Sequence, residues 1–189
     1  MYDNKSIDIL ELLPKNLDSN SLYLKLAKEV VNYPFFQFCS ASLSNHHYGT
    51  AGLQYHTWDV IRLCLANAAI VGGANIKILY FAALFHDIGK TFDYYRLDGP
   101  SDSWSATIHK RKIHHISRSC FIFNSIIESE KYDGLFNVGE IDHILHIILS
   151  HHGQKEWGSP VQPQTKEAWI LHLCDSLSAR CDDLGIHKK

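Results

Sequence analysis

Apolar residues recur every three or four positions through most of the chain, the spacing that places them on one face of an α-helix. This pattern predicts helices over residues 21–31, 53–71, 75–87, 113–127, 140–150 and 165–181. Ser21, Asn75 and Thr165 begin three of these stretches, and such residues cap helices through a side-chain oxygen. No stretch alternates between apolar and polar residues long enough to predict a strand. We therefore expect an all-α fold, a compact bundle of about six to eight helices.

Two segments between the predicted helices lack this periodicity. Residues 91–110 are polar and irregular, but they include the aromatic residues Phe92, Tyr94, Tyr95 and Trp104. Residues 153–163 form a second loop, which contains Trp157. Loops of this length inside a compact domain are more often functional than idle. The organisation expected is a single structural domain, with residues 1–40 as a helical lead-in packed on a main domain of residues 41–189.

Composition narrows the class of protein. The 189 residues are 46% hydrophobic, enough for one compact domain with an ample core. The net charge of −2 gives no broad basic surface, although His109-Lys110-Arg111-Lys112 can form a local positive patch. The longest apolar run, residues 78–85, is far shorter than the roughly 20 residues of a membrane span. Acidic residues near the start, such as Asp3 and Asp8, argue against a signal peptide. We expect a cytoplasmic protein that does not associate with a membrane.

Histidine is the unusual component, because the chain has thirteen of them and imidazole is the commonest metal ligand. Histidine or aspartate falls at or near the apolar faces of five predicted helices, at His56, His86-Asp87, His115, His151-His152 and Asp175. A carboxylate that faces a core is costly unless a cation offsets its charge. Several imidazoles with two carboxylates favour one or two divalent transition-metal ions, Mn, Fe, Co, Ni or Zn, over an all-oxygen calcium site.

The segment that ends at Lys90 has several candidate metal-binding and catalytic residues close together in the sequence. An apolar helix there ends in the adjacent ligands His86 and Asp87, and Gly89 is expected to let the chain turn sharply. Lys90 then follows at a place where it can meet an anion held by the metal. The sequence has no nucleophile elbow of the Gly-x-Ser-x-Gly type and no phosphate-binding glycine loop to support another chemistry.

Most isolated histidines on helices are hydrogen-bonded core or surface residues rather than ligands. This reading applies to four histidines without a matching partner in the pattern, His143, His146, His172 and His187. His46 and His47 lie in a loop, where they either line a substrate-binding mouth or are merely solvated. The pattern leaves open whether His114 or His115 faces inward, and whether His151, His152 or both are ligands.

The order of these residues resembles the HD superfamily of metal-dependent phosphohydrolases. The resemblance covers residues 44–181, and it is closest to the HD domain of the YhaM-type 3′-to-5′ exoribonucleases. It rests on residues 45–47, 52–57, 83–90, 148–153, 156–160 and 171–180. The Ser-His-His-Gly and Trp-Gly-Ser-Pro segments are its more specific parts. A family histidine in a Gly-His-Ile segment falls on His115 and favours it over His114, although His114 stands where the family has glycine.

The resemblance implies an HD-domain bundle that hydrolyses phosphoesters with a metal-activated water. His56, His86, Asp87 and Asp175 would hold one ion, and His115 with His151, His152 or both would complete a second or shared site. Asp87 would accept a proton and Lys90 would neutralise charge on the phosphoryl oxygens. The aromatic residues of the 91–104 loop and Trp157 can stack on a base, so the expected substrate is a nucleotide or a nucleic-acid 3′ end. His46, His47, Lys90 and Trp157 are the candidate substrate-binding residues.

Two alternatives stay open at this point. The first is a small-molecule (deoxy)nucleotide phosphatase or triphosphohydrolase of the HD type. The exoribonucleases have an OB-type domain ahead of the HD domain, whereas only about 40 residues precede the match here, too few for such a barrel. The second is a non-catalytic, metal-bound module for nucleic acid or protein, because residues 46–90 also resemble the HD-like domain of TraI-type conjugative relaxases. The aromatic content is compatible with a homodimer but does not require one.

Overall fold

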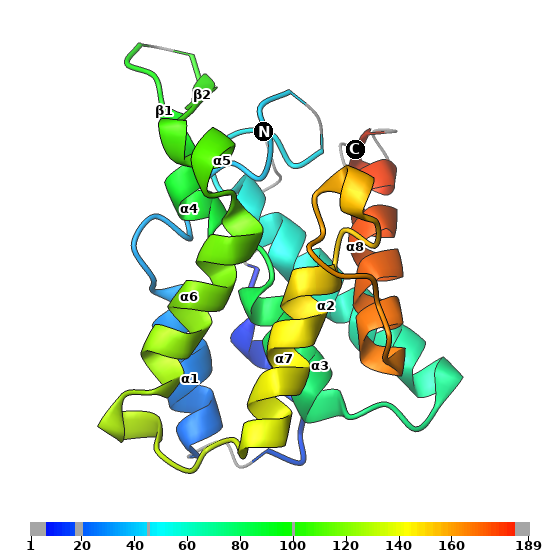
Figure 1. Cartoon of the computed structure of the whole chain (residues 1–189). Helices are drawn as coiled ribbons and strands as arrows, with labels where there is room; N and C mark the ends of the chain where they lie inside the picture. Colours follow the sequence, from blue (N-terminus) through cyan, green and yellow to red (C-terminus); the bar gives the residue numbers. More distant parts are fainter. Residues whose placement is uncertain (1–6, 18–20, 45, 100, 184–189) are drawn as a thin grey trace.

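The fold is a bundle of α-helices with one small β-hairpin at an end of the bundle (Figure 1). A computed structural model describes residues 7–17, 21–44, 46–99 and 101–183. The helices in that part are α1 (Leu22–Val31), α2 (Gly52–Val71), α3 (Ile76–Phe85), α4 (Lys90–Asp93), α5 (Ile108–Lys112), α6 (His115–Ile127), α7 (Val138–Ser150) and α8 (Lys166–Asp183). Three 3₁₀ turns accompany them, at Leu10–Leu12, Glu130–Tyr132 and Lys155–Trp157. The expected all-α bundle is thereby confirmed.

The helix starts follow from capping residues in the sequence. The Ser21 hydroxyl accepts a hydrogen bond from the Tyr23 amide, and the Asn75 side chain accepts one from the Ile78 amide. Thr165 accepts a hydrogen bond from the amide of Ala168 at the start of α8. Helix α7 begins two residues earlier than the apolar pattern predicted, because Asn137 forms a capping box with Glu140.

Helix α3 is the centre of the bundle. Its residues 78–85 are all buried, and the helix packs against α1, α2, α6, α7 and α8. A helix that is apolar on every side can lie only inside a protein, so this run of residues determines which element the others surround. The buried residues of α1, Leu26, Ala27 and Val30, belong to the same hydrophobic core. The division between a lead-in and a main domain at residue 40 stays a prediction.

Residues 91–110 correct one expectation, because they are ordered rather than irregular. They contain most of α4, the strands β1 (Tyr94–Arg96) and β2 (Trp104–Ala106), and the first three residues of α5. The two strands pair antiparallel, with Tyr94 opposite Ala106 and Arg96 opposite Trp104. Strands of three residues are too short to show the alternation of apolar and polar residues that is typical of a strand. The prediction that the chain has no strand was therefore wrong. The hairpin projects from the end of the bundle where α6 begins and α7 ends (Figure 1).

None of the helices in the described ranges is both long enough and apolar enough to cross a membrane.

Candidate metal centre

Five helices deliver histidine or aspartate side chains to one place. His86 and Asp87 directly follow the last residue of α3, and His151 follows the last residue of α7. His115 is the first residue of α6, while His56 and Asp175 lie within α2 and α8. The start of α6 and the end of α7 are at the same end of the bundle (Figure 1). The centre is therefore built mainly from helix ends that surround the buried terminus of α3.

The inner group consists of His56, His86, Asp87 and Asp175, and one ligand atom of each lies within 4.8 Å of the others. The Nε2 atom of His56 is 2.9 Å from Asp175 Oδ1, 3.3 Å from Asp87 Oδ2 and 3.4 Å from His86 Nε2. His56 and His86 have no exposed surface, and Asp87 is 1% exposed. Two imidazoles and two carboxylates that converge at these distances can hold one divalent transition-metal ion.

A second group, His115, His151 and His152, lies on the other side of Asp87. Asp87 Oδ1 is 3.3 Å from His115 Nε2 and 3.6 Å from His151 Nε2, whereas its Oδ2 faces His56 and His86. One carboxylate thus faces both groups, each through a different oxygen. The spacing suits either one shared ion or two ions bridged by Asp87.

His86 and His151 are oriented by hydrogen bonds from Nδ1, the ring nitrogen that faces away from the centre. His86 Nδ1 is 2.6 Å from the carbonyl oxygen of Ala83, and His151 Nδ1 is 2.7 Å from that of Ile148. Because a carbonyl only accepts, both Nδ1 atoms carry the proton and both Nε2 atoms present a lone pair to the centre. Within the described residues, Asp87 Oδ1, His115 Nε2 and His151 Nε2 are buried without a hydrogen-bond partner. Buried polar atoms are rarely left unpaired, so these converging lone pairs fit a cation.

Electrostatics also favours a cation at this centre. Burial lowers the pKa of His56, but hydrogen bonds and charge from Asp175 and Asp87 outweigh burial and raise it to about 9. Burial raises the pKa of Asp87, yet the Lys90 ammonium, 2.6 Å away, and the neighbouring histidines hold that pKa well below its usual range. Two ionised carboxylates in a buried site stabilise positive charge beside them. A divalent ion would supply that charge.

Asp93, in the last position of α4, is a residue that the sequence analysis missed. It is fully buried, and its two oxygens lie 3.2 Å from His115 Nδ1 and 2.8 Å from His109 Nδ1. Burial raises the pKa of Asp93, but hydrogen bonds from His115 and His109 outweigh it and keep the group ionised. Since His115 donates from Nδ1 to this carboxylate, its Nε2 presents a lone pair to the centre. A carboxylate behind a histidine in this way orients metal ligands.

Two glycines allow the approach of the chain segments that form the site. A Cβ on Gly89 would lie 2.3 Å from the carbonyl oxygen of His115, and one on Gly52 would lie 1.8 Å from that of His47. The chain does turn at residues 86–89, but Gly89 has a right-handed φ of −62°, which any residue can adopt. It is needed because the start of α6 packs directly on it, which brings His115 to Asp87.

Two cavities open beside the centre, and both are lined by His46 and His152. The lysine pocket, about 340 Å³, also includes Lys90, Lys110 and His115 in its wall. The tryptophan pocket, about 260 Å³, is lined as well by Trp157, Asp175 and Arg180. Each cavity therefore combines cationic side chains with a residue of the candidate metal centre. An anionic substrate could reach the centre from either side.

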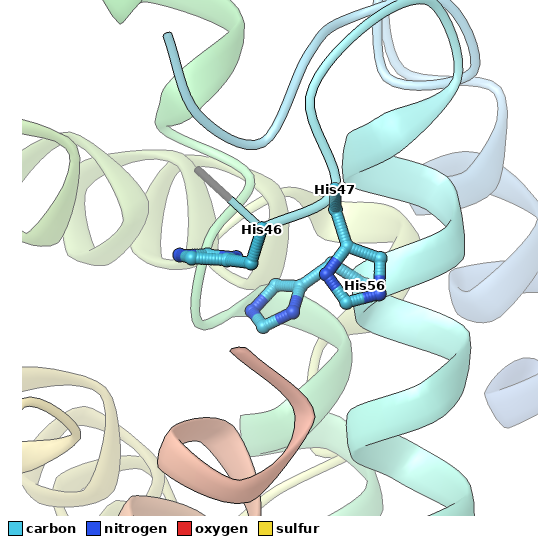
Figure 2. A group of neighbouring side chains, drawn as sticks. All are labelled: His46, His47 and His56. Atoms are coloured by element: carbon cyan, nitrogen blue, oxygen red, sulfur yellow. The ribbon is translucent and has the colours of Figure 1, made fainter. Parts of the chain in front are cut away.

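The candidate substrate-binding residues differ in position. His46, Lys90 and Trp157 line the pockets, and Trp157 is 58% exposed with its ring stacked on His172. His47 is 3% exposed and lies behind the rim, with its ring 5.0 Å from that of His56. Figure 2 shows the rings of His46, His47 and His56 close together, and these three histidines form another group close enough to hold an ion.

The local geometry distinguishes the two histidines in each adjacent pair, His114-His115 and His151-His152. His115 and His151 are buried and face Asp87. His114 has a left-handed backbone with φ of 71° and lines the lysine pocket, while His152 Nδ1 bonds to the Trp157 carbonyl oxygen. In this arrangement His115 and His151 form the inner pair, and His114 and His152 form the rim.

The histidines expected to be structural bond to partners other than the ligand atoms of the centre. His143 bonds to Thr165 and Glu167, His146 accepts from the Gln164 amide, and His172 bonds to the carbonyl oxygen of His151. His187 lies outside the described residues.

The chain is similar to proteins of one known family. The family model described as "HD domain" matches residues 53–180. The chain is 34% identical over 182 residues to the 3′-5′ exoribonuclease YhaM of Bacillus subtilis (strain 168), covering 95% of this chain and 54% of that protein. The YhaM proteins of Bacillus velezensis and Geobacillus sp. are 34% and 35% identical, over 91% and 77% of this chain and 51% and 42% of their own. No solved structure matches the chain.

The chain spans about half the length of the curated relatives it matches. The match nevertheless covers every residue of both ligand groups at Asp87, and it confirms the resemblance to the YhaM-type HD domain. Both comparisons indicate a hydrolase of the HD phosphohydrolase type. The chain belongs to the HD domain family.

Proposed function

We propose that this chain is a metal-dependent phosphodiesterase that hydrolyses the phosphoester at the 3′ end of a nucleic-acid strand. The observation that carries the proposal is Asp87, whose two oxygens face two groups of inward-pointing histidines at the junction of two cation-lined pockets. The 3′-5′ exoribonuclease name of the relatives supports the choice of a strand end over a free nucleotide.

A divalent Mn, Fe, Co, Ni or Zn ion bound at the centre would act as a Lewis acid on a phosphoryl oxygen and lower the pKa of a water molecule. The ligand set proposed for it is His56, His86, Asp87, His115, His151 and Asp175, with His152 at the rim. The Nε2 lone pairs of His86 and His151 already face the centre, so these two rings require no reorientation on binding.

The surrounding residues would bind the phosphate and move the proton. Lys90, ion-paired with Asp87 Oδ2 and part of the lysine pocket wall, approaches the phosphoryl oxygens. Lys110 supplies a second ammonium in the same pocket. Asp87 Oδ1, which has no hydrogen-bond partner among the residues that the structure describes, would accept the proton of the attacking water. Trp157 offers an exposed face to a base in the tryptophan pocket.

The test compares substrates on one metal-loaded preparation. We expect hydrolysis of bis-p-nitrophenyl phosphate and stepwise shortening of a 5′-labelled single-stranded RNA from its 3′ end. A circular RNA of the same sequence is the matched control and should resist. Turnover of deoxynucleoside triphosphates or monophosphates without any cleavage of RNA or DNA strands would replace the proposal with a nucleotide phosphatase. A metal-loaded protein that hydrolyses none of these substrates would point to a binding module.

A further inference from the structure

An aromatic cavity lies next to the lysine pocket, and none of the proposed chemistry uses it. Its volume is about 610 Å³, and its walls include Phe35, Phe38, Tyr94, Tyr95, Arg96 and Trp104. We call it the aromatic groove. The first two residues come from the segment between α1 and α2, and the others come from the β1–β2 hairpin. Its size is within the range of small-molecule and cofactor sites.

The groove presents large apolar side chains to solvent. Phe35 is 70% exposed, Phe38 63% and Tyr95 48%. Soluble proteins rarely gather exposed aromatic rings in one place unless the patch binds something. Phe35 also has a left-handed backbone with φ of 65°, a conformation that is unfavourable for a bulky residue. Strained positions of this kind concentrate at ligand-binding segments.

The groove shares its wall with the candidate active site. Tyr94 lines both the aromatic groove and the lysine pocket. Lys110 donates a 2.6 Å hydrogen bond to the Tyr94 hydroxyl, and its ammonium lies 4.3 Å from the centre of the Tyr94 ring. Thr91, directly after Lys90, also lines the groove. A ligand could therefore lie along the groove while its next phosphate contacts Lys110 and Lys90.

We propose that the aromatic groove binds nucleobases of a single strand upstream of the phosphoester at the metal centre, an inference that rests on the proposed function. Aromatic faces stack on any base, so such a groove recognises single strands with little dependence on sequence. Arg96 at its rim adds a cation for the backbone or for stacking. The aromatic rings of the groove lie next to two lysines. Rings suit the bases of a strand and lysines suit its phosphates, so this arrangement favours a nucleic-acid strand over a protein segment.

The experiment measures Phe38→Ala and Tyr95→Ala against Phe121→Ala, which removes an equally exposed ring on α6 outside the groove. We expect KM for a single-stranded hexanucleotide to rise about tenfold in each groove variant, within the range that loss of one stacked base produces. The turnover of bis-p-nitrophenyl phosphate should stay unchanged, because this substrate reaches only the metal centre. Phe121→Ala should match the parent protein in both assays.

Two further readouts separate the possible failures. Fluorescence anisotropy with the same labelled hexanucleotide tests binding even if the protein hydrolyses no substrate, so the proposed function and the groove fail independently. Equal affinity of the parent protein and the groove variants for the hexanucleotide would overturn the groove proposal. A dimer of the parent protein that dissociates in the groove variants, with unchanged hexanucleotide affinity, would also overturn it and identify the groove as a subunit interface.

Discussion

The candidate metal centre and the aromatic groove are built in opposite ways, although they lie on two sides of Tyr94. Side chains of the centre such as His56 and His86 are fully buried, and a second contact fixes each ring. The groove uses exposed rings on a loop and a hairpin, as Phe35 and Tyr95 show. The contrast suggests that buried helix ends position the chemistry, whereas surface segments select the substrate. Substitutions in the two regions should therefore affect different kinetic parameters.

The largest effect should come from Asp87→Asn. The amide retains the size of the side chain but removes the charge that faces both histidine groups. We expect kcat/KM for bis-p-nitrophenyl phosphate to fall by more than about 100-fold, the upper range for loss of a group that only orients a ligand. Circular dichroism should show an intact helical fold. Activity within tenfold of the parent would contradict the role given to Asp87.

Asp93→Asn should weaken metal binding while the fold remains. The asparagine side chain has one oxygen where aspartate has two, so it cannot accept hydrogen bonds from both His115 and His109 in the same way. His115 then loses its fixed orientation. We expect the metal dissociation constant to rise by about 10- to 100-fold, as measured by calorimetric titration. Asp142→Asn, an exposed change on α7, is the matched control and should bind metal normally. If kcat fell but metal affinity did not, the positioning role would be wrong.

Gly89→Ala should lower stability, because its Cβ would lie 2.3 Å from the His115 carbonyl oxygen and 2.9 Å from the Ser119 amide nitrogen. Overpacking of this kind costs about 1–3 kcal/mol in the free energy of unfolding. Urea denaturation measures the change. Gly139→Ala is the control, because a Cβ at that position would meet nothing closer than 3.4 Å. We expect this variant to have an unchanged free energy of unfolding, or to be more stable by up to about 1 kcal/mol. Equal stability of the two variants would exclude close packing as the reason for Gly89.

The smallest effect should come from Trp157→Ala. Trp157 lines the tryptophan pocket but is 58% exposed, so stacking there is only partly shielded from water. We expect an increase of about fivefold in KM for an oligonucleotide, the lower end for loss of a stacked base, with unchanged kcat. Trp169→Ala is the control, since this ring also contacts His172 but lies outside the pocket. A large drop in kcat would place Trp157 in the chemical step instead.

Most of the helices and the convergence of the candidate ligands were predictable from the regular spacing of buried positions. Leu171 is four residues before Asp175, and Ile148 is three before His151, so the apolar stripes direct these side chains inward. Helix α3 was indicated differently, by the continuous apolar run at residues 78–85 after the cap Asn75. Ligands that share a face with core residues can be found without knowing how the helices pack.

Asp93 and Lys110 could not be found by that reasoning. Asp93 reaches His109 and His115 because α4 packs against both α5 and α6, and the three-residue strands between α4 and α5 leave no periodic signal. Lys110 was visible only as part of a short basic cluster, and its direction depends on Tyr94. The available signal in the sequence was an aspartate six residues after Asp87. It becomes meaningful only once the tertiary contacts are known.

The most direct test of the account is the metal content of the chain. The protein should be loaded with Mn or Ni, separated from free ions by gel filtration and measured by elemental analysis, beside His86→Ala. The converging lone pairs predict about one or two ions per chain, with most of that content lost in the variant. A parent protein without bound metal, or a variant that retains the same content, would contradict the claim that the buried histidines and carboxylates form a metal centre.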